Sequence, residues 1–383
     1  MTLSPPRLAP VPLVDLAAAH AEVAQEVQAG FARVLATTQF IKGPDVAAFE
    51  EEFAAFCGVR HCVGTASGTD AVELALRAAG AGPGDSVLLP ANTFIATAEA
   101  VLRAGARPLL VDVDPEGLLM DPARVPDALD ADGGGRGVKV LVPVHLHGQL
   151  APMEDLLALA RRHGLTVVED AAQAHGAKRY GRPAGAWGRL AATSFYPGKN
   201  LGAYGDGGAV LTDDAELADT VRLLGDHGSR HKYVHERHGF NSRLDTLQAV
   251  VLRAKLTRLA DWNARRHAAA ERYAALLGAM DGVLLPAVLP GNQHIWHVYA
   301  VRVPHRDAVL AHLQGHGIGA GVHYPVPVHL QPAFRPFGYA RGDFPVAERA
   351  AEELLSLPLF PHITAAQQER VADTLATALA ATQ

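Results

Sequence analysis

The sequence predicts an α/β fold in which helices wrap a mostly parallel central sheet. Two observations predict this fold. Between about residues 59 and 211, short apolar runs alternate with amphipathic stretches at helical spacing, as in chains whose strands alternate with helices. The chain also has 383 residues, of which 49% are hydrophobic and 19% charged, so it can bury a large core.

Six short apolar runs are the expected strands of the sheet. In chain order they are SVLLP near Val87, RPLLVDV near Leu110, VKVLVPVHL near Leu141, LTVVED near Val168, LAATSF near Thr193 and GGAVLT near Val210. The amphipathic stretches between them are the expected helices, and these include residues 70–79, 97–103 and 153–163.

The second half of the chain has a different pattern. DDAELADTVRLLGDHG predicts a helix, and apolar residues then continue at helical spacing for more than thirty residues from LDTLQAVV to RYAALL. After this long helix we expect a strand in HVYAVRV, a helix in DAVLAHLQGHG, an irregular segment and two closing helices. The sequence therefore predicts a large domain over residues 1–250 and a smaller C-terminal α+β domain over residues 251–383.

Charge and hydropathy exclude two classes of partner. The 40 acidic and 34 basic residues give a formal net charge of -6, which provides no footprint for nucleic acid. The apolar stretches are all shorter than the roughly 20 residues that cross a bilayer. MTLSPPRLAPVPLVDL has neither a basic region nor an unbroken apolar run, so we expect no secretion signal and a cytoplasmic location.

Cysteines and histidines predict no metal site. Cys57 and Cys62 have four residues between them, which fits neither a zinc pair nor a redox motif, and we expect two buried thiols. HLHG places His145 and His147 two residues apart, but an isolated pair is a weak metal signal.

Polar residues that follow the expected strands are candidates for a ligand site, because ligands bind at the carboxyl ends of strands in open α/β sheets. LTVVE brings Asp170 to this edge, and Gln173 and His175 follow. A buried carboxylate is costly unless it meets a positive partner, such as a cationic ring nitrogen. The alternative is that Asp170 caps the next helix.

A second candidate is TASGTDA, in which Ser67, Gly68 and Thr69 precede an expected helix. Small residues let backbone amides approach a phosphate, and the helix N-terminus favours negative charge. Because Ser, Thr and Gly are also common helix caps, capping alone is the alternative.

The third candidate is SFYPGKNLGAYGDGGAV, in which Lys199 follows Ser194 by five residues. A partly desolvated lysine can lose its proton near neutral pH and form a Schiff base with an aldehyde. Asp170 would then meet the ring nitrogen of the same cofactor, and Ser67 to Thr69 with Ser194 would hold its phosphate. This set of groups describes pyridoxal phosphate.

Six ordered segments resemble one known family over nearly the whole chain, from about VDLAAAH to the last helix. They are SGTDA, PANTFIATAEAV, VEDAAQAHGA, SFYPGKNLGAYGDGGAV, GFNSRLDTLQA and GVHYPVPVHLQPAF. Together they resemble the DegT/DnrJ/EryC1/StrS family of pyridoxal-phosphate-dependent nucleotide-sugar aminotransferases. The resemblance implies fold type I, the aspartate aminotransferase-like fold.

The resemblance also implies roles for single residues. Lys199 matches the lysine that binds the cofactor aldehyde, and Asp170 matches the acid on the pyridine nitrogen. Phe94 matches an aromatic that stacks on the ring, and Gln173 matches a residue near the phenolic oxygen. The resemblance implies contacts with the cofactor phosphate from Gly68, Thr69, Ser194 and the partner subunit's Asn241. It implies contacts with the sugar nucleotide from His323, Tyr324 and His329.

Some of these positions have alternatives that the sequence leaves open. Phe94 is otherwise a core residue, and His323 and His329 are otherwise structural histidines of a loop. His175 is expected to be a hydrogen-bonded residue behind the site rather than a catalyst. His147 stands where related sequences have an aromatic residue, so a substrate contact there does not follow.

The resemblance implies that an amino group moves from L-glutamate to a nucleotide-linked keto sugar, with a dTDP-3-keto-6-deoxyhexose as the expected substrate. Amination at C4, a UDP- or GDP-linked sugar and a cyclitol are alternatives. Dehydratases of the family have histidine in place of the lysine, which Lys199 argues against. A non-catalytic, cofactor-binding regulator would carry a basic or helix-turn-helix module, which the sequence does not show. The partner role of Asn241 implies a homodimer.

Overall fold

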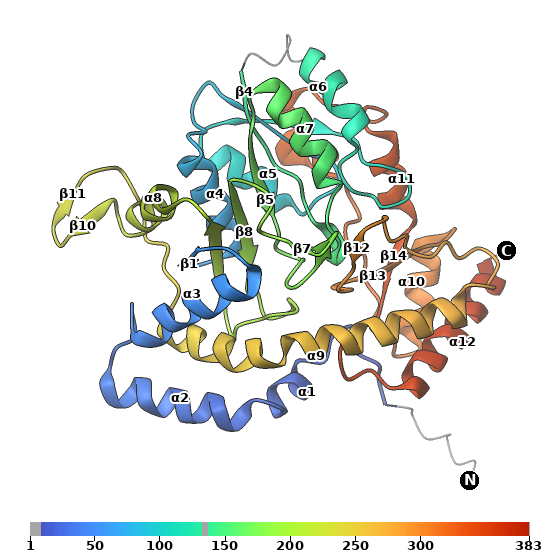
Figure 1. Ribbon diagram of the computed structural model, residues 1–383. Helices are drawn as coiled ribbons and strands as arrows, with labels where there is room; N and C mark the ends of the chain where they lie inside the picture. Colours follow the sequence, from blue (N-terminus) through green and yellow to red (C-terminus); the bar gives the residue numbers. More distant parts are fainter. Residues whose placement is uncertain (1–8, 132–136, 383) are drawn as a thin grey trace.

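The computed structural model describes residues 9–131 and 137–382 (Figure 1). Residues 1–8, which are part of the stretch that predicts no secretion signal, lie outside this description. Among the described residues no helix is long and apolar enough to cross a membrane.

A central sheet of seven strands forms the body of the molecule, in the order β1-β9-β8-β5-β4-β2-β3. The strands are β1 His61–Thr65, β2 Ser86–Pro90, β3 Arg107–Val111, β4 Val138–Leu141, β5 Thr166–Asp170, β8 Leu190–Ser194 and β9 Gly208–Thr212. Only β9 runs against its neighbours, β1 and β8. The prediction of a mostly parallel sheet is confirmed, and each of the six apolar runs contains a strand.

Strand β1 was not among the predicted strands. Its sequence, HCVGT, has a histidine at one end and a glycine between its apolar residues, so no apolar run marks it. It is a strand because all five of its residues pair with β9, a contact that joins segments far apart in the sequence. Tertiary pairing therefore overrides a weak local pattern here.

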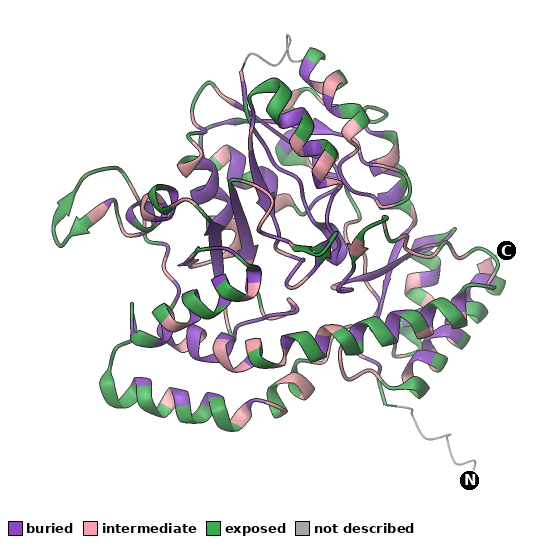
Figure 2. Cartoon of the chain, viewed as in Figure 1, coloured by how far each residue is buried: buried purple, intermediate pink, exposed green. Residues whose placement is uncertain are grey.

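Helices cover both faces of the sheet, as the side chains of β2 show. Val87 and Leu89 pack in one core cluster with three helices and with α11, Pro345–Glu353, whereas Leu88, which points to the opposite face, packs in another with two helices. The first three helices are α4 Gly68–Ala78, α5 Ile95–Arg103 and α8 Ala215–Gly225, and the other two are α6 Val125–Ala131 and α7 Met153–His163. Buried strands enclosed by helices with exposed outer faces are visible in Figure 2.

The predicted long helix is present as α9, Thr246–Leu277. Its first half packs on α3, Pro44–Cys57, and α2, Ala24–Thr37, and its far end meets α12, Ala365–Thr382 (Figure 1). The predicted domain boundary at residue 250 falls inside this helix, and the division into two domains stays a prediction.

The C-terminal part has its own small sheet and core. Its elements are β13 Tyr299–Arg302, α10 Arg306–Gly315, α11 Pro345–Glu353, β14 Leu354–Leu357 and α12. β13 and β14 pair antiparallel and pack with α10, α12 and the end of α9. Val11 from the start of the described chain joins this cluster and exchanges backbone hydrogen bonds with Gly317 and Gly319.

The remaining elements are short. They are α1 Leu16–Ala21, a three-stranded sheet of β6 Lys178–Arg179, β7 Arg182–Pro183 and β12 Asn292–Gln293, and a hairpin of β10 Ser229–His231 and β11 Val234–His235. The hairpin projects from the body beyond α8 (Figure 1).

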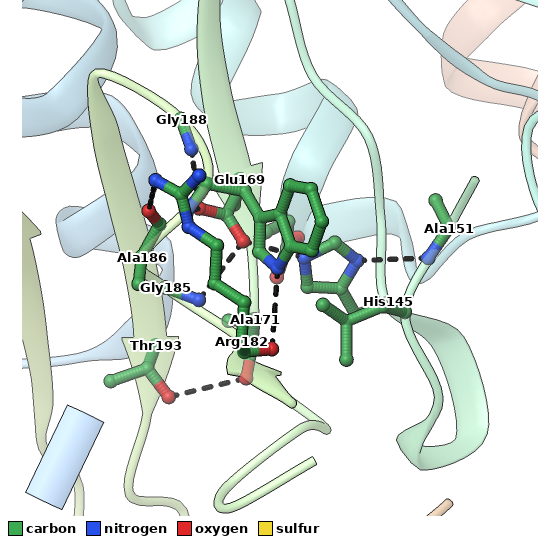
Figure 3. Close-up of polar contacts among 12 residues, drawn as sticks. His145, Ala151, Glu169, Ala171, Arg182, Gly185, Ala186, Gly188 and Thr193 are labelled. Carbon is green, nitrogen blue, oxygen red and sulfur yellow. Dashed lines mark hydrogen bonds and ion pairs between the residues drawn. The ribbon is translucent and has the colours of Figure 1, made fainter. Parts of the chain in front are cut away.

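A buried carboxylate fixes the end of β5. Glu169 accepts hydrogen bonds from the backbone N–H groups of Trp187 and Gly188 at one oxygen, both at 2.7 Å. Its other oxygen accepts from the Gly185 N–H at 2.9 Å and from His145 Nε2 at 2.8 Å (Figure 3). Both oxygens are thus satisfied, as a fully buried charge requires.

The hydrogen bonds also set the protonation states of this pair. His145 Nδ1 accepts from the backbone N–H of Ala151 at 3.2 Å, so Nε2 carries the proton that Glu169 accepts (Figure 3). Burial alone would raise the pKa of Glu169, but the hydrogen bonds from His145 and the backbone outweigh it and lower the pKa. Glu169 therefore ties the loops at 145–151 and 185–188 to β5.

Replacing Glu169 by Gln is expected to destabilise the fold by about 3 kcal/mol, because an amide NH₂ group then faces backbone or His145 donors and leaves them unpaired. Urea unfolding of the two proteins measures the loss. The control is Glu99→Gln at an exposed position of α5, where a change within about 0.5 kcal/mol is expected. Equal stability of the two variants would show that the Glu169 carboxylate does not hold these loops to β5.

Candidate active site

A cavity of about 530 Å³ opens at the carboxyl ends of β5 and β8, a size typical of small-molecule sites. The rest of its wall comes from the N-terminal ends of α4 and α5 and from segments near residues 13, 145, 206, 297, 323 and 357. Of the predicted site residues, the structure brings nine to this cavity: Gly68, Thr69, Phe94, Asp170, Gln173, Ser194, Lys199, His323 and Tyr324. Asn241 and His329 are not among them.

Lys199 lies in a turn after β8, in which its backbone N–H donates to the Tyr196 carbonyl at 2.8 Å. Burial lowers the pKa of its amine to about 8, while the nearby Asp170 carboxylate acts in the opposite direction. At pH 7 about one molecule in ten therefore carries a neutral, nucleophilic amine. The Lys199 amine thus faces a cavity instead of bulk water, although most lysines lie on the solvated surface.

Asp170 is the last residue of β5 and is only 6% exposed. One carboxylate oxygen accepts from the Thr97 hydroxyl at 2.8 Å, and the other accepts from the Ala172 N–H at 3.1 Å. These bonds fix the carboxylate at the cavity wall. An ionised carboxylate has about four acceptor positions, so it retains capacity for a donor inside the cavity.

The N-terminus of α4 forms a cradle of the kind that binds phosphate. Ser67 caps the helix by accepting from the Asp70 N–H at 3.1 Å, whereas the preceding amides of Gly68 and Thr69 have no acceptor within the helix. A Cβ atom at Gly68 would lie 2.4 Å from Ser194 Cβ, so only glycine allows α4 and β8 to approach this closely. The three predicted phosphate contacts of this chain therefore lie together.

Aromatic and amide groups also line the cavity. The rings of Phe94 and Tyr324 lie 5.2 Å apart, and Phe94 is 50% exposed, so its reading as a core residue is wrong. Gln173 donates to the Tyr324 hydroxyl at 3.1 Å and accepts from the His147 N–H at 2.6 Å. Gln173 thereby joins the β5 edge to the segment at 323–324.

The two predicted histidines of the irregular segment have different positions. His323 borders the cavity, and its Nδ1 bonds the Ser356 hydroxyl at 2.8 Å; burial and the charge of Lys199 lower its pKa. His329 does not reach the cavity. Its buried ring bonds Glu348 at 2.9 Å and packs edge-on against Phe344, so the predicted substrate contact of His329 is replaced by a structural role.

His175 and His147, whose roles the sequence left open, are not among the residues that line the cavity. His175 bonds the Thr193 hydroxyl at 2.9 Å, and burial lowers its pKa to about 3, in agreement with the reading of a hydrogen-bonded neighbour. His147 is neutral as well, because burial lowers its pKa to about 4, and its Nε2 donates to the His323 carbonyl at 3.1 Å. His147 thus supports the segment that carries His323 and Tyr324.

Sequence reasoning missed five polar residues of the cavity, namely Thr93, Thr97, Tyr196, Asp206 and His297. Thr97 carries the hydrogen bond to Asp170, and its place at the start of the helix expected over residues 97–103 was an available signal. His297 borders the cavity two residues before β13, and its Nδ1 bonds Asn200 Oδ1 at 3.0 Å. No local pattern marks His297, because a contact between residues 97 positions apart brings it there.

These groups fit pyridoxal phosphate. One cavity holds an amine with a lowered pKa, a buried carboxylate, exposed aromatic surface and a helix N-terminus whose amides and hydroxyls suit a dianion. The family model described as the DegT/DnrJ/EryC1/StrS aminotransferase family matches residues 21–376. The chain belongs to this family. Aminotransferases of the family depend on pyridoxal phosphate, which makes it the cofactor of this protein.

Curated relatives and solved structures agree with this assignment. The chain is 47% identical, over 95% of its length and 95% of the relative's, to the dTDP-3-amino-3,4,6-trideoxy-alpha-D-glucose transaminase of Streptomyces venezuelae. It is 48% identical, over 95% and 98% of the two lengths, to the erythromycin biosynthesis sensory transduction protein EryC1 of Saccharopolyspora erythraea. The crystal structure of S. venezuelae DesV with a ketimine intermediate matches with a TM-score of 0.93 and 47% identity, over 97% of this chain and 98% of that one. The expected fold type I is therefore confirmed.

The lowered pKa of Lys199 predicts a pH dependence. Only the neutral amine attacks an aldehyde, so the rate at which cofactor-free protein binds pyridoxal phosphate should rise with pH to a half-maximum near pH 8. In Asp170→Asn the half-maximum should move to lower pH, because the carboxylate that favours the ammonium form is gone. Stopped-flow absorbance measures both profiles. A half-maximum near pH 10.5 in either protein would contradict the burial of the amine.

Proposed function

We propose that this aminotransferase moves an amino group from L-glutamate to a nucleotide-linked keto sugar, most specifically to C3 of a dTDP-3-keto-6-deoxyhexose. The observation that carries the proposal is the meeting of Lys199, Asp170 and the α4 cradle in one cavity that has room for further ligand. The similar S. venezuelae transaminase, whose name specifies a 3-amino dTDP sugar, supports the choice of C3 and of the dTDP carrier.

The chain's residues divide the work. Pyridoxal phosphate, when bound, supplies the electron sink for the charge that develops at the substrate carbon. Lys199 moves a proton to and from that carbon as general base and acid, for which a pKa of about 8 is suitable near neutral pH. Asp170 holds a proton on the ring nitrogen, and Gly68, Thr69 and Ser194 bind the phosphate. Phe94 packs against the ring and Gln173 binds near its phenolic oxygen.

His323 and Tyr324 take the sugar end of the substrate in this proposal. Both border the cavity on the side that the C-terminal part provides, and burial keeps both uncharged by lowering the pKa of His323 and raising that of Tyr324. Neutral donors and acceptors suit hydroxyl and carbonyl groups better than charged side chains do, because they bind without the cost of an unpaired charge.

A regulatory role is the rival from another class, and the printed name of the relative EryC1 includes sensory transduction. A regulator that binds the cofactor would also need a neutral lysine, so the choice between the two rests on the family, whose description and whose S. venezuelae member are those of an aminotransferase. The cytoplasmic location stays a prediction.

An absorbance titration tests the function. The purified protein with pyridoxal phosphate is mixed with L-glutamate and then with single keto sugars: dTDP-3-keto, dTDP-4-keto, UDP-linked, GDP-linked and a cyclitol ketone. The cofactor band should change with glutamate and return only with the dTDP-3-keto sugar, and Lys199→Ala should turn over none of them. Return with another sugar would replace the proposed substrate, and no change in any mixture would favour the regulator.

The proposed enzyme is a homodimer in which Asn241 reaches the cofactor phosphate of the partner subunit. Asn241 is exposed and does not border the cavity of its own chain. It follows the projecting hairpin, in which the adjacent Tyr233 and Val234 are 83% and 57% exposed and offer apolar surface for a contact. These features support contact with a second copy.

Mixing two inactive variants tests this arrangement. Lys199→Ala and Asn241→Ala chains are unfolded together and refolded, so that mixed dimers form. Each mixed dimer contains one site with both residues intact, and about a quarter of wild-type activity should return. Each variant refolded alone is the control. If the mixture gains nothing over the sum of the controls, Asn241 serves its own chain.

A further inference from the structure

The loop between β8 and β9 carries Lys199, and its central part is buried. Asn200, Leu201, Gly202 and Ala203 are all buried although they belong to no helix or strand. Buried backbone groups outside regular structure need specific hydrogen-bond partners. The conformation of this loop, and with it the direction of the Lys199 side chain, therefore depends on the groups that supply them.

One face of α9 supplies hydrogen-bond partners for this loop, two for its backbone groups and one for the Asn200 side chain. Gln248 Oε1 accepts from the Tyr204 N–H at 2.8 Å, Lys255 Nζ donates to the Gly202 carbonyl at 2.6 Å, and Asn263 Oδ1 accepts from Asn200 Nδ2 at 2.9 Å. The three α9 residues are seven and eight positions apart, close to two helical turns each time, so they form one stripe on the helix. We call Gln248, Lys255 and Asn263 the α9 stripe.

The orientation of the amides in this network is determined by carbonyl groups. Asn263 Nδ2 donates to the His175 carbonyl at 2.8 Å, so its oxygen faces Asn200. Asn200 Nδ2 also donates to the Ile295 carbonyl at 3.1 Å, so Asn200 Oδ1 is the acceptor for His297 Nδ1. Asn200, the residue directly after Lys199, is thus held by hydrogen bonds with Asn263, Ile295 and His297.

Lys255 is the unusual member of the stripe. It is only 4% exposed, and its amine has the Gly202 carbonyl and the face of the Tyr204 ring, 4.5 Å away, as partners. Burial lowers its pKa to about 8. A buried amine costs free energy wherever it replaces an apolar side chain, so its position is explained by what it holds and not by packing.

We propose that the α9 stripe positions Lys199 by holding the loop on its C-terminal side, with Lys255 as the central positioning residue. Gln248, Lys255 and Asn263 touch neither substrate nor cofactor in this proposal and act through the loop. The inference rests on the proposed catalytic role of Lys199, but the conformation of the loop can be measured without any turnover.

Lys255→Met tests the proposal, because methionine keeps an apolar stem and removes the donor to Gly202. In cofactor-free protein, hydrogen exchange of the Ala203 and Tyr204 amides should become at least about tenfold faster, while exchange along α9 stays unchanged. With cofactor and substrates, kcat should fall about tenfold and KM for the sugar should change less than about twofold.

Arg258→Met is the matched control. Arg258 is also on α9, and its replacement removes only an exposed ion pair with Glu26 of α2. Gln248→Ala is the second test variant, and it removes the acceptor of the Tyr204 N–H. Because it removes no buried charge and keeps a strong helix former in α9, it decides the question if Lys255→Met does not fold.

Faster exchange confined to the loop supports the proposal even where no sugar tested is a substrate, which separates it from the proposed function. Unchanged loop exchange in Lys255→Met and Gln248→Ala would overturn it. Exchange that increases equally in the loop and in α9 would also overturn it, because the stripe would then stabilise the fold in general.

Discussion

The partial desolvation of one amine is the constraint on which the rest of the cavity depends. Burial lowers the pKa of Lys199 and the Asp170 carboxylate raises it, so burial is the larger of the two effects. Burial lowers the pKa values of His175, His297 and His323, and the charge of Lys199 lowers each of them further. The histidines near the amine therefore add no positive charge beside it, and the carboxylates that border the cavity are Asp170 and Asp206.

The alternation of side chains along β5 explains how one strand supports both the site and the fold. Adjacent residues of a strand point to opposite sides, so Asp170 faces the cavity while Glu169 is buried and accepts hydrogen bonds from the backbone and from His145. A shift of one residue in register would exchange the two carboxylates. The tight satisfaction of Glu169 therefore holds Asp170 at the cavity, and parallel pairing with β8 brings Ser194 to the same edge.

Local pattern predicted the fold well because the strands and helices of the core are apolar at regular spacing. It also predicted the strand-end residues Asp170 and Ser194, since the carboxyl ends of parallel strands meet at one edge. His329 and His297 show the limit. His297 lies in IWHVYA and His329 in VPVHLQP, and neither local pattern indicates a cavity. The contacts of His297 with Asn200 and of His329 with Glu348 decide which of the two borders it.

Two lysines of this chain have a pKa lowered to about 8 by burial, yet only one is suited to chemistry. Lys255 donates to a backbone carbonyl, lies against a tyrosine ring and is outside the cavity lining, so a lost proton would not make it accessible to a substrate. Lys199 borders open volume beside a carboxylate. A perturbed pKa therefore identifies desolvation, and the cavity together with Asp170 identifies the nucleophile.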